Sequence, residues 1–440
     1  MQKSFIIALF TFSVTLGFGQ ENPPVPETNT VILNTNQTAT PQVLEEVESE
    51  EEMLDSLAVT PVDKETEKVV LSKKKAKGAV RSRNAKLEAV PAYEGAEMED
   101  ESVEMDADMS VGSAVQSEQT IQSAQIQQAT YKFSASKGRA SEQRLQRSPT
   151  LMQQMEMDQA VGTLEASAPN SFEYHYFKYV SGNYDVSLVS NLKAAEALRP
   201  NNADVHVQLA AYNIIKRNSD SAKVYVSQLI ASGRLESNVL HYGEDILASV
   251  PNNWVLITHG FDDTYSVWKK QNIDGQRTDV KLISLDFLQS EYYRNKLKSD
   301  GFKLPQSQVV NVQYLNRFCE LNSGKGLSIS MTTPKEYFEP LKSKLYVTGL
   351  VFEYHEKEFN NFERNDDLWN KGLSKHLIDN ATDEKSQQLS SNYLPMLLQL
   401  RKVYKQKEEI EKFKEVDAAV DKVGLQCKKY DQVQRLKKSY

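Results

Sequence analysis

The chain has 440 residues, with 52 Lys and Arg residues against 60 Asp and Glu residues and a formal net charge of −8. That length allows two or three domains. The acidic balance argues against a nucleic-acid-binding protein, because the chain as a whole has no basic surplus to replace the counterions of a phosphate backbone.

Residues 1–20 have the form of a secretory signal peptide. Lys3 precedes an apolar run from Phe5 to Phe18, and small residues follow. The run is too short to cross a bilayer, which needs about 20 apolar residues, and no later stretch of the sequence is apolar enough to span one. We therefore expect an exported chain with no membrane span. The expected location is the periplasm, with secretion or surface display as alternatives.

Residues 21–165 are predicted to be a disordered, charge-blocked arm of low complexity. An acidic run from Glu45 to Glu52 is followed by a basic block from Lys73 to Lys86 and a second acidic block from Glu97 to Asp108. Few apolar residues recur at helical or strand spacing, so little buried apolar area would offset the entropy of ordering. Such blocks are typical of a solvated tail or an interaction arm.

Residues 171–250 are predicted to form helices, with Asp185 and Asp220 as two of the N-terminal caps. Asn183 and Asp185 recur as Asn218 and Asp220, an offset of 35 residues (218 minus 183). This is close to the tetratricopeptide period of about 34 residues. Stacked repeats of that kind leave a concave surface for a partner. A plain helical hairpin that supports the next domain is the alternative.

Residues 251–360 are predicted to form an α/β domain with a mostly parallel sheet. Three short apolar runs are the first expected strands, and they begin at Val255, Val280 and Leu327. Helical segments separate these runs, which is typical of parallel strands joined by right-handed crossovers in three layers. Tyr346–Tyr354 is expected as a fourth strand, or as two halves bent at Gly349. Residues 361–440 are expected to be helical, so helices flank the α/β domain on both sides.

The turn after the first strand contains the candidate ligand-binding residues. They are His259, Asp262, Asp263, Thr264 and Trp268. An apolar strand that ends in His-Gly is similar to the oxyanion loop of α/β-hydrolases, but that class also needs a G-x-S-x-G elbow. The nearest strings, which start at Gly326 and Gly372, both lack the closing glycine. We therefore assign no catalytic residue.

The paired acids of this turn do not predict a metal site. Adjacent carboxylates point in different directions, and a metal needs a third and a fourth ligand. We expect neither a metal nor another cofactor. Asp263 is better explained as an acid at a helix N-terminus, where it accepts hydrogen bonds from free backbone N–H groups.

The segment from Val255 to Trp268 is similar to part of a family of Bacteroidota membrane proteins, the protein O-mannosyltransferase-like proteins. The matching positions are Gly260, Asp263, Thr264 and Trp268. The differing positions are His259, Phe261 and Asp262. The likeness covers about residues 250–420 and lies in that family's soluble periplasmic C-terminal region. It implies a periplasmic α/β domain combined with tetratricopeptide-like helices. It does not carry over glycosyl transfer, which in that family belongs to the membrane domain.

The expected function is that of an exported, non-catalytic binding or scaffold protein of the cell envelope, which docks a protein partner or a glycan. The alternative is an enzyme, or its accessory subunit, that processes glycans or lipid-linked sugars at the turn over residues 259–264. That alternative requires His259, Asp262 and Asp263 to converge in one open pocket. The oligomeric state and the pairing of Cys319 with Cys427 stay open at this point.

Overall fold

The computed structural model describes residues 122–137 and 147–439. The expected signal peptide and the charge blocks of the arm lie outside the described residues. A helix over residues 122–137 and the helix α4 (Leu151–Ser167) lie within or next to the segment for which disorder was predicted. The prediction was wrong for these two helices, because they share a buried apolar cluster with Phe177 of the next helix. Their buried members are Ala129, Phe133, Met157, Ala160, Val161 and Leu164.

Five α-helices lie between α4 and the first strand. They are α5 (Phe172–Ser181), α6 (Val189–Leu198), α7 (Ala203–Lys216), α8 (Ser219–Ala231) and α9 (Ser237–Ser249). The predicted cap at Asp185 is confirmed, since its carboxylate accepts a hydrogen bond from the N–H of Ser187 at 2.9 Å in the short turn before α6. The predicted cap at Asp220 is wrong. The cap position of α8 is Asn218, so Asp220 lies inside the first turn with its side chain exposed.

The sheet has five short strands. They are β1 (Val255–Thr258), β2 (Lys281–Ser284), β3 (Leu327–Ser330), β4 (Leu345–Thr348) and β5 (Val351–Tyr354). The spatial order is β2-β1-β3-β5-β4, with β1 parallel to β2 and β3, and with β5 antiparallel to β3 and β4. The sheet is therefore mixed and not mostly parallel. The cause is the bend at Gly349, whose φ of +57° closes β4 and β5 into a hairpin.

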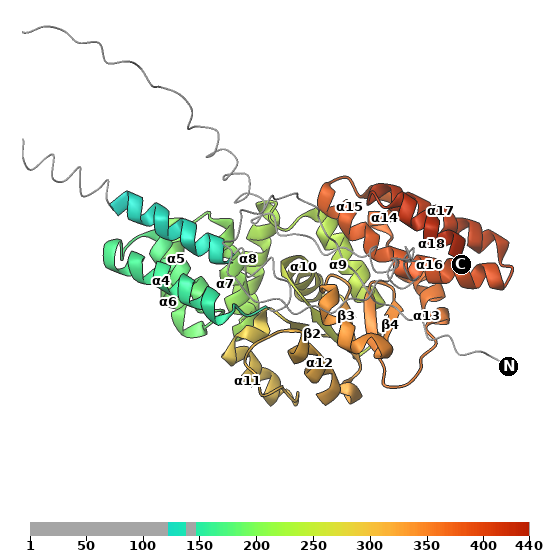
Figure 1. Cartoon of the computed structure of the whole chain (residues 1–440), viewed down its shortest axis with the longest axis horizontal. Coiled ribbons are helices and arrows are strands. Elements are labelled where there is room, and N and C mark those ends of the chain that lie inside the picture. The colour runs from blue at the N-terminus through green and yellow to red at the C-terminus, as the bar shows by residue number, and fades with distance from the viewer. Residues whose placement is uncertain (1–121, 138–146, 440) are drawn as a thin grey trace, which may run out of the picture.

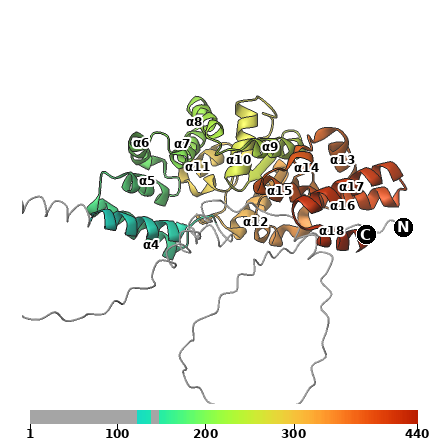
Figure 2. The same ribbon diagram turned by 90° about the horizontal axis from the view of Figure 1, so that it is seen from above.

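Helices cover both faces of the sheet. The helix α10 (Phe261–Asn272) joins β1 to β2, whereas α11 (Glu291–Ser299) and α12 (Val312–Leu321) join β2 to β3. These two connections run in opposite directions across β1, so right-handed crossovers place α10 and α12 on opposite faces. Figure 2 shows α9 and α10 on the opposite side of the molecule from α12.

The C-terminal part is helical, as predicted. Its helices are α13 (Phe362–Asp367), α14 (His376–Asn380), α15 (Glu384–Ser390), α16 (Leu394–Gln406), α17 (Ile410–Gln426) and α18 (Tyr430–Ser439). Figure 1 shows α4 to α6 at one end of the long axis, α16 to α18 at the other, and the sheet between them. One apolar core runs from Ala210 to Leu436 and includes α9, the sheet and the C-terminal helices. The predicted boundaries after residues 250 and 360 therefore mark changes of element type within one core.

Two further expectations concern membranes and cysteines. Within residues 122–137 and 147–439, no helix is both long and apolar enough to cross a bilayer. Cys319 is buried on α12, as expected for a thiol on an apolar helix face, and Cys427 is partly buried; both are free thiols.

Candidate functional site

The candidate site is the edge of the sheet at which the parallel strands β1, β2 and β3 end. The next residues along the chain are His259 after β1, Leu285 and Asp286 after β2, and Met331 after β3. The connection from β1 leads to β2, which lies on one side of β1. The connection from β2 leads to β3, which lies on the other side of β1. In α/β folds, ligands bind at the carboxyl ends of strands where the connections diverge in this way.

Asp263 is fully enclosed at this edge, in the first turn of α10; the N-cap position is Gly260, and Asp263 accepts hydrogen bonds at the start of the helix as an acid was expected to do there. One carboxylate oxygen accepts a hydrogen bond from the N–H of Gly260 at 2.9 Å, and the other accepts from the N–H of His259 at 2.8 Å. The hydroxyl of Thr332, after β3, donates to the second oxygen at 2.5 Å. Burial raises the pKa of Asp263, and these hydrogen bonds act in the opposite direction. The carboxylate of Asp263 is therefore occupied by hydrogen bonds from within the chain.

Thr264 belongs to a chain of buried hydroxyl groups that links the strand ends. Its hydroxyl lies 2.8 Å from that of Thr258 on β1 and donates to Ser284 on β2 at 3.2 Å. A second pair, Ser330 and Thr332, lies 2.8 Å apart at the end of β3 and continues to Asp263. These side chains hold the three strand ends together and are closed to solvent.

His259 contacts a residue that the sequence did not indicate. Its Nε2 lies 3.1 Å from Nη1 of Arg147, in the segment before α4. Arg147 also donates through Nε to the carboxylate of Asp286 at 2.5 Å. The ring of Tyr337 lies 6.1 Å from that of His259, edge to face. Arg147 falls in the predicted arm and no local pattern marks it, so its role emerges only from the fold.

The remaining candidates point elsewhere. Asp262 forms an ion pair with Lys385 of α15 at 3.2 Å, and Lys385 also lies 3.6 Å from Glu236 before α9. Trp268 is 6% exposed and belongs to the main core. Successive positions on a helix point about 100° apart at 3.6 residues per turn, which separates Asp262 from Asp263. The convergence of His259, Asp262 and Asp263 in one open pocket, which the enzyme alternative requires, is not found.

The same edge contains polar groups that have no partner in the described part of the chain. The hydroxyl of Thr333 follows β3, and that of Ser290 follows β2. Both side chains are only 1% exposed. Buried polar groups are nearly always hydrogen-bonded in native proteins, and ordered water molecules are common partners for them.

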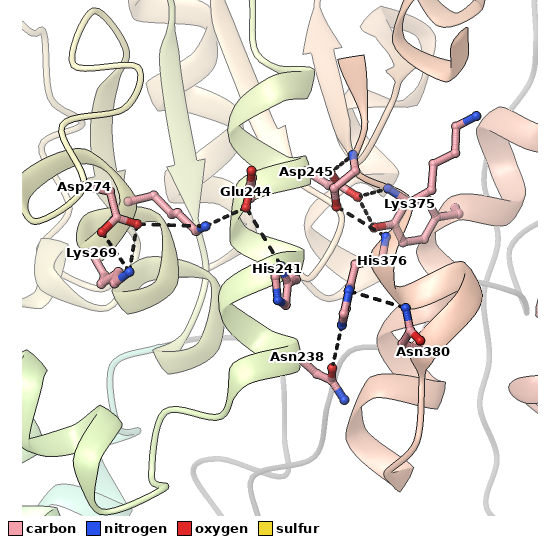
Figure 3. A network of polar contacts seen from close by, with 12 residues as sticks. Asn238, His241, Glu244, Asp245, Lys269, Asp274, Lys375, His376 and Asn380 are labelled. Carbon is pink, nitrogen blue, oxygen red and sulfur yellow. Dashed lines mark hydrogen bonds and ion pairs between the residues drawn. The ribbon is translucent and has the colours of Figure 1, made fainter. Parts of the chain in front are cut away.

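A second polar network lies between α9 and α14 (Figure 3). The rings of His241 and His376 are stacked, with centroids 3.8 Å apart. Burial, the neighbouring His376 and Lys270 lower the pKa of His241, against the opposing effect of Glu244. In the described ranges, no group of three or more His, Cys, Asp or Glu side chains is placed to hold a metal ion. Lys270 of α10 also pairs with Glu244 of α9 at 2.5 Å, so the network joins α10 as well as α9 and α14.

Two surface cavities lie away from the candidate residues. One, of about 630 Å³, lies between the loop at 304–311 and α12. The other, of about 540 Å³, lies along α13 and contains Arg364 and Asp367. Neither is lined by any of the five predicted binding residues.

The fold is a small mixed sheet enclosed by helices, and a family model matches this part of the sequence. Residues 239–434 match the family model of TMEM260-associated domain 2. The match begins within α9 and ends within α18, so it covers the sheet and the C-terminal helices as one unit. It supports the resemblance at the level of a domain from a membrane-protein family. No curated protein and no solved structure matches the chain.

Proposed function

We propose that this chain is a non-catalytic docking protein of the cell envelope, which binds a partner protein through α4. The observation that carries the proposal is a surface on that helix, formed by Leu151, Met152 and Met155, which we name the α4 patch. Their side chains are 79%, 65% and 58% exposed. Large apolar side chains clustered on a soluble surface are typical of sites for protein contact.

The other face of α4 strengthens this proposal. Met157, Ala160 and Leu164 are buried in the cluster that α4 shares with α5 and the helix over residues 122–137. A helix that covers a core on one side needs no apolar residue on its exposed side. Methionine side chains adapt to varied apolar surfaces because they are unbranched and flexible. The α4 patch therefore suits an apolar segment of a partner protein.

The carboxyl edge of the sheet supports binding in preference to catalysis. Asp263 is engaged by backbone N–H groups, His259 faces Arg147, and Asp262 faces Lys385. Each of these three predicted residues thus stabilises a different junction of the fold. The arrangement leaves no acid and base facing a common reacting atom, which general acid–base chemistry would require.

Export and family are part of the same proposal. We propose that residues 1–20 direct the chain to the periplasm and that α5 to α8 are tetratricopeptide-like. The recurrence of Asn183 and Asp185 at residues 218 and 220, and the pairing of consecutive helices, support the second point. We further propose that residues 239–434 correspond to the soluble region of the Bacteroidota O-mannosyltransferase-like proteins. The docked partner is then an envelope protein.

Site-specific photo-crosslinking tests the docking surface. A crosslinking amino acid replaces Met152 in one chain and Ala166, an exposed residue near the other end of α4, in a control chain. We expect a discrete adduct with an envelope protein from position 152 and none from position 166. Equal labelling at both positions, or an adduct only with a second copy of this chain, contradicts the proposal.

Point variants are preferable to deletion of the helices. Tyr242 and Ile246 of α9 belong to the main core, so removing residues 171–250 would unfold the sheet. The double variant Met152→Gln and Met155→Gln changes only exposed side chains. We expect it to keep the melting temperature and to lose the adduct formed by a crosslinker at position 151.

A further inference from the structure

The segment that precedes α4 bends at Arg147 and Ser148 and is bound to the α/β domain through main-chain hydrogen bonds. The N–H groups of Arg147 and Ser148 donate to the carbonyl oxygen of Val310 at 2.7 Å and 3.4 Å. The N–H of Val310 donates in return to the hydroxyl of Ser148 at 3.1 Å. Main-chain hydrogen bonds thus fix the segment, and a separate contact holds the Arg147 side chain.

The Arg147 side chain is held at the carboxyl edge of the sheet. It is 20% exposed, and its partner Asp286 is 13% exposed. A hydrogen bond between two charged groups is about twice as strong as a neutral one. His259 provides a second contact for the guanidinium group, at 3.1 Å. Asp286 also lies close enough to Asp263 to help raise the pKa of that carboxyl, after the effect of burial. A cation at this position therefore offsets repulsion between two enclosed acids.

The site also contains polar groups beyond those that bind the Arg147 side chain. Tyr337 lies close enough to Arg147 and Asp286 for their charges to act on the pKa of its hydroxyl, which burial raises. The enclosed hydroxyl of Thr333, four residues earlier in the chain, has no hydrogen-bond partner among the described residues. A water molecule or a polar group of an incoming segment would satisfy this hydroxyl.

We propose that the carboxyl edge of the sheet is a docking site for a peptide segment that carries arginine followed by serine, and that Arg147-Ser148 is its resident, displaceable occupant. The α4 helix and its neighbours have their own apolar cluster. Departure of the segment therefore exposes the site without opening the main core. The segment leads directly into α4, which begins at Leu151.

A tethered occupant competes with any added peptide. Short flexible tethers give effective concentrations of about 1 mM, so the wild-type chain masks its own site. Replacing Arg147 by alanine removes the side chain that fills the site and leaves Asp286 and His259 in place. The variant site is then open to a peptide supplied in solution.

Peptide binding to the full mature chain tests the proposal. The probe is a fluorescein-labelled peptide with the sequence of residues 146–150, Gln-Arg-Ser-Pro-Thr, and the readout is fluorescence anisotropy. We expect the Arg147→Ala chain to bind it at least tenfold more tightly than the wild type. Adding Asp286→Asn to that chain is expected to weaken binding at least tenfold. A control chain, Arg317→Ala, loses an arginine that is 59% exposed on α12 and is expected to match the wild type.

The folded state of each variant is checked by its melting temperature, so that lost binding is not confused with unfolding. A peptide in which alanine replaces the arginine is the matched probe and is expected not to bind. No binding by a folded Arg147→Ala chain overturns the proposal, and so does equal binding by all the chains. A concentration-dependent dimer that requires Arg147 would assign the resident segment to a second copy, which also contradicts the proposal. The outcome is independent of the α4 patch.

Discussion

Replacement of Asp263 by alanine is the most informative stability test, because its carboxylate joins β1, α10 and the loop after β3. The change removes the acceptor for the N–H groups of His259 and Gly260 and for the hydroxyl of Thr332. Leaving a buried donor unsatisfied costs about 1–3 kcal/mol. Removal of the buried carboxylate also removes the free-energy cost of keeping that charge away from water, which offsets part of this loss. We therefore expect a net loss of about 3–5 kcal/mol.

Thermal unfolding followed by circular dichroism measures this loss. For a folded unit of about 200 residues, 1 kcal/mol corresponds to roughly 2–4 °C, so the melting temperature is expected to fall by about 10 °C. Asp220→Ala is the matched control, because Asp220 is exposed and caps no helix. We expect that control to shift stability by no more than about 0.5 kcal/mol. An Asp263→Ala chain as stable as the control would refute the capping role.

Three further predictions concern other parts of the fold. The lowered pKa of His241, caused by burial and then by His376, means that the unfolded chain binds more protons below the ordinary histidine pKa of about 6.5. The melting temperature is thus expected to fall as pH drops from about 7.5 to about 5, and less so in His241→Phe; equal slopes would contradict this. Gly349→Ala is expected to cost more than about 2 kcal/mol in urea unfolding, because φ is positive and the new Cβ would clash with Ser249; an unchanged midpoint argues against it. Cys319, whose pKa is raised by burial, is expected to resist a thiol reagent until the chain unfolds. Fast labelling of Cys319 in the native state would contradict this expectation.

The parts of the site that could be predicted depend on residues close together in sequence. The N–H groups that bind Asp263 lie three and four residues before it, so an acid after an apolar strand is enough to indicate the cap. The positions of the strands follow from short apolar runs for the same reason. Thr150 and Gln153 also form a local capping box at the start of α4, and that signal was available in the sequence.

The other features depend on residues far apart in sequence. Arg147 lies 112 positions from His259 and 139 from Asp286, and no spacing rule connects them. The direction of β5 was also undetermined, because alternation between Tyr346 and Tyr354 fits a straight strand or a hairpin equally well. The partner of Asp262 was also unpredictable, because Lys385 of α15 lies 123 positions away in the sequence.

The central claim is that the α4 patch docks an envelope protein and that the turn after β1 serves the fold. Quantitative affinity purification from envelope extracts tests it most directly, with three tagged chains: wild type, Met152→Gln with Met155→Gln, and His259→Ala with Asp262→Ala. We expect one specific envelope protein that the wild type and the turn variant both retain and that the patch variant loses. Loss of that protein from the turn variant, with retention by the patch variant, would contradict the account.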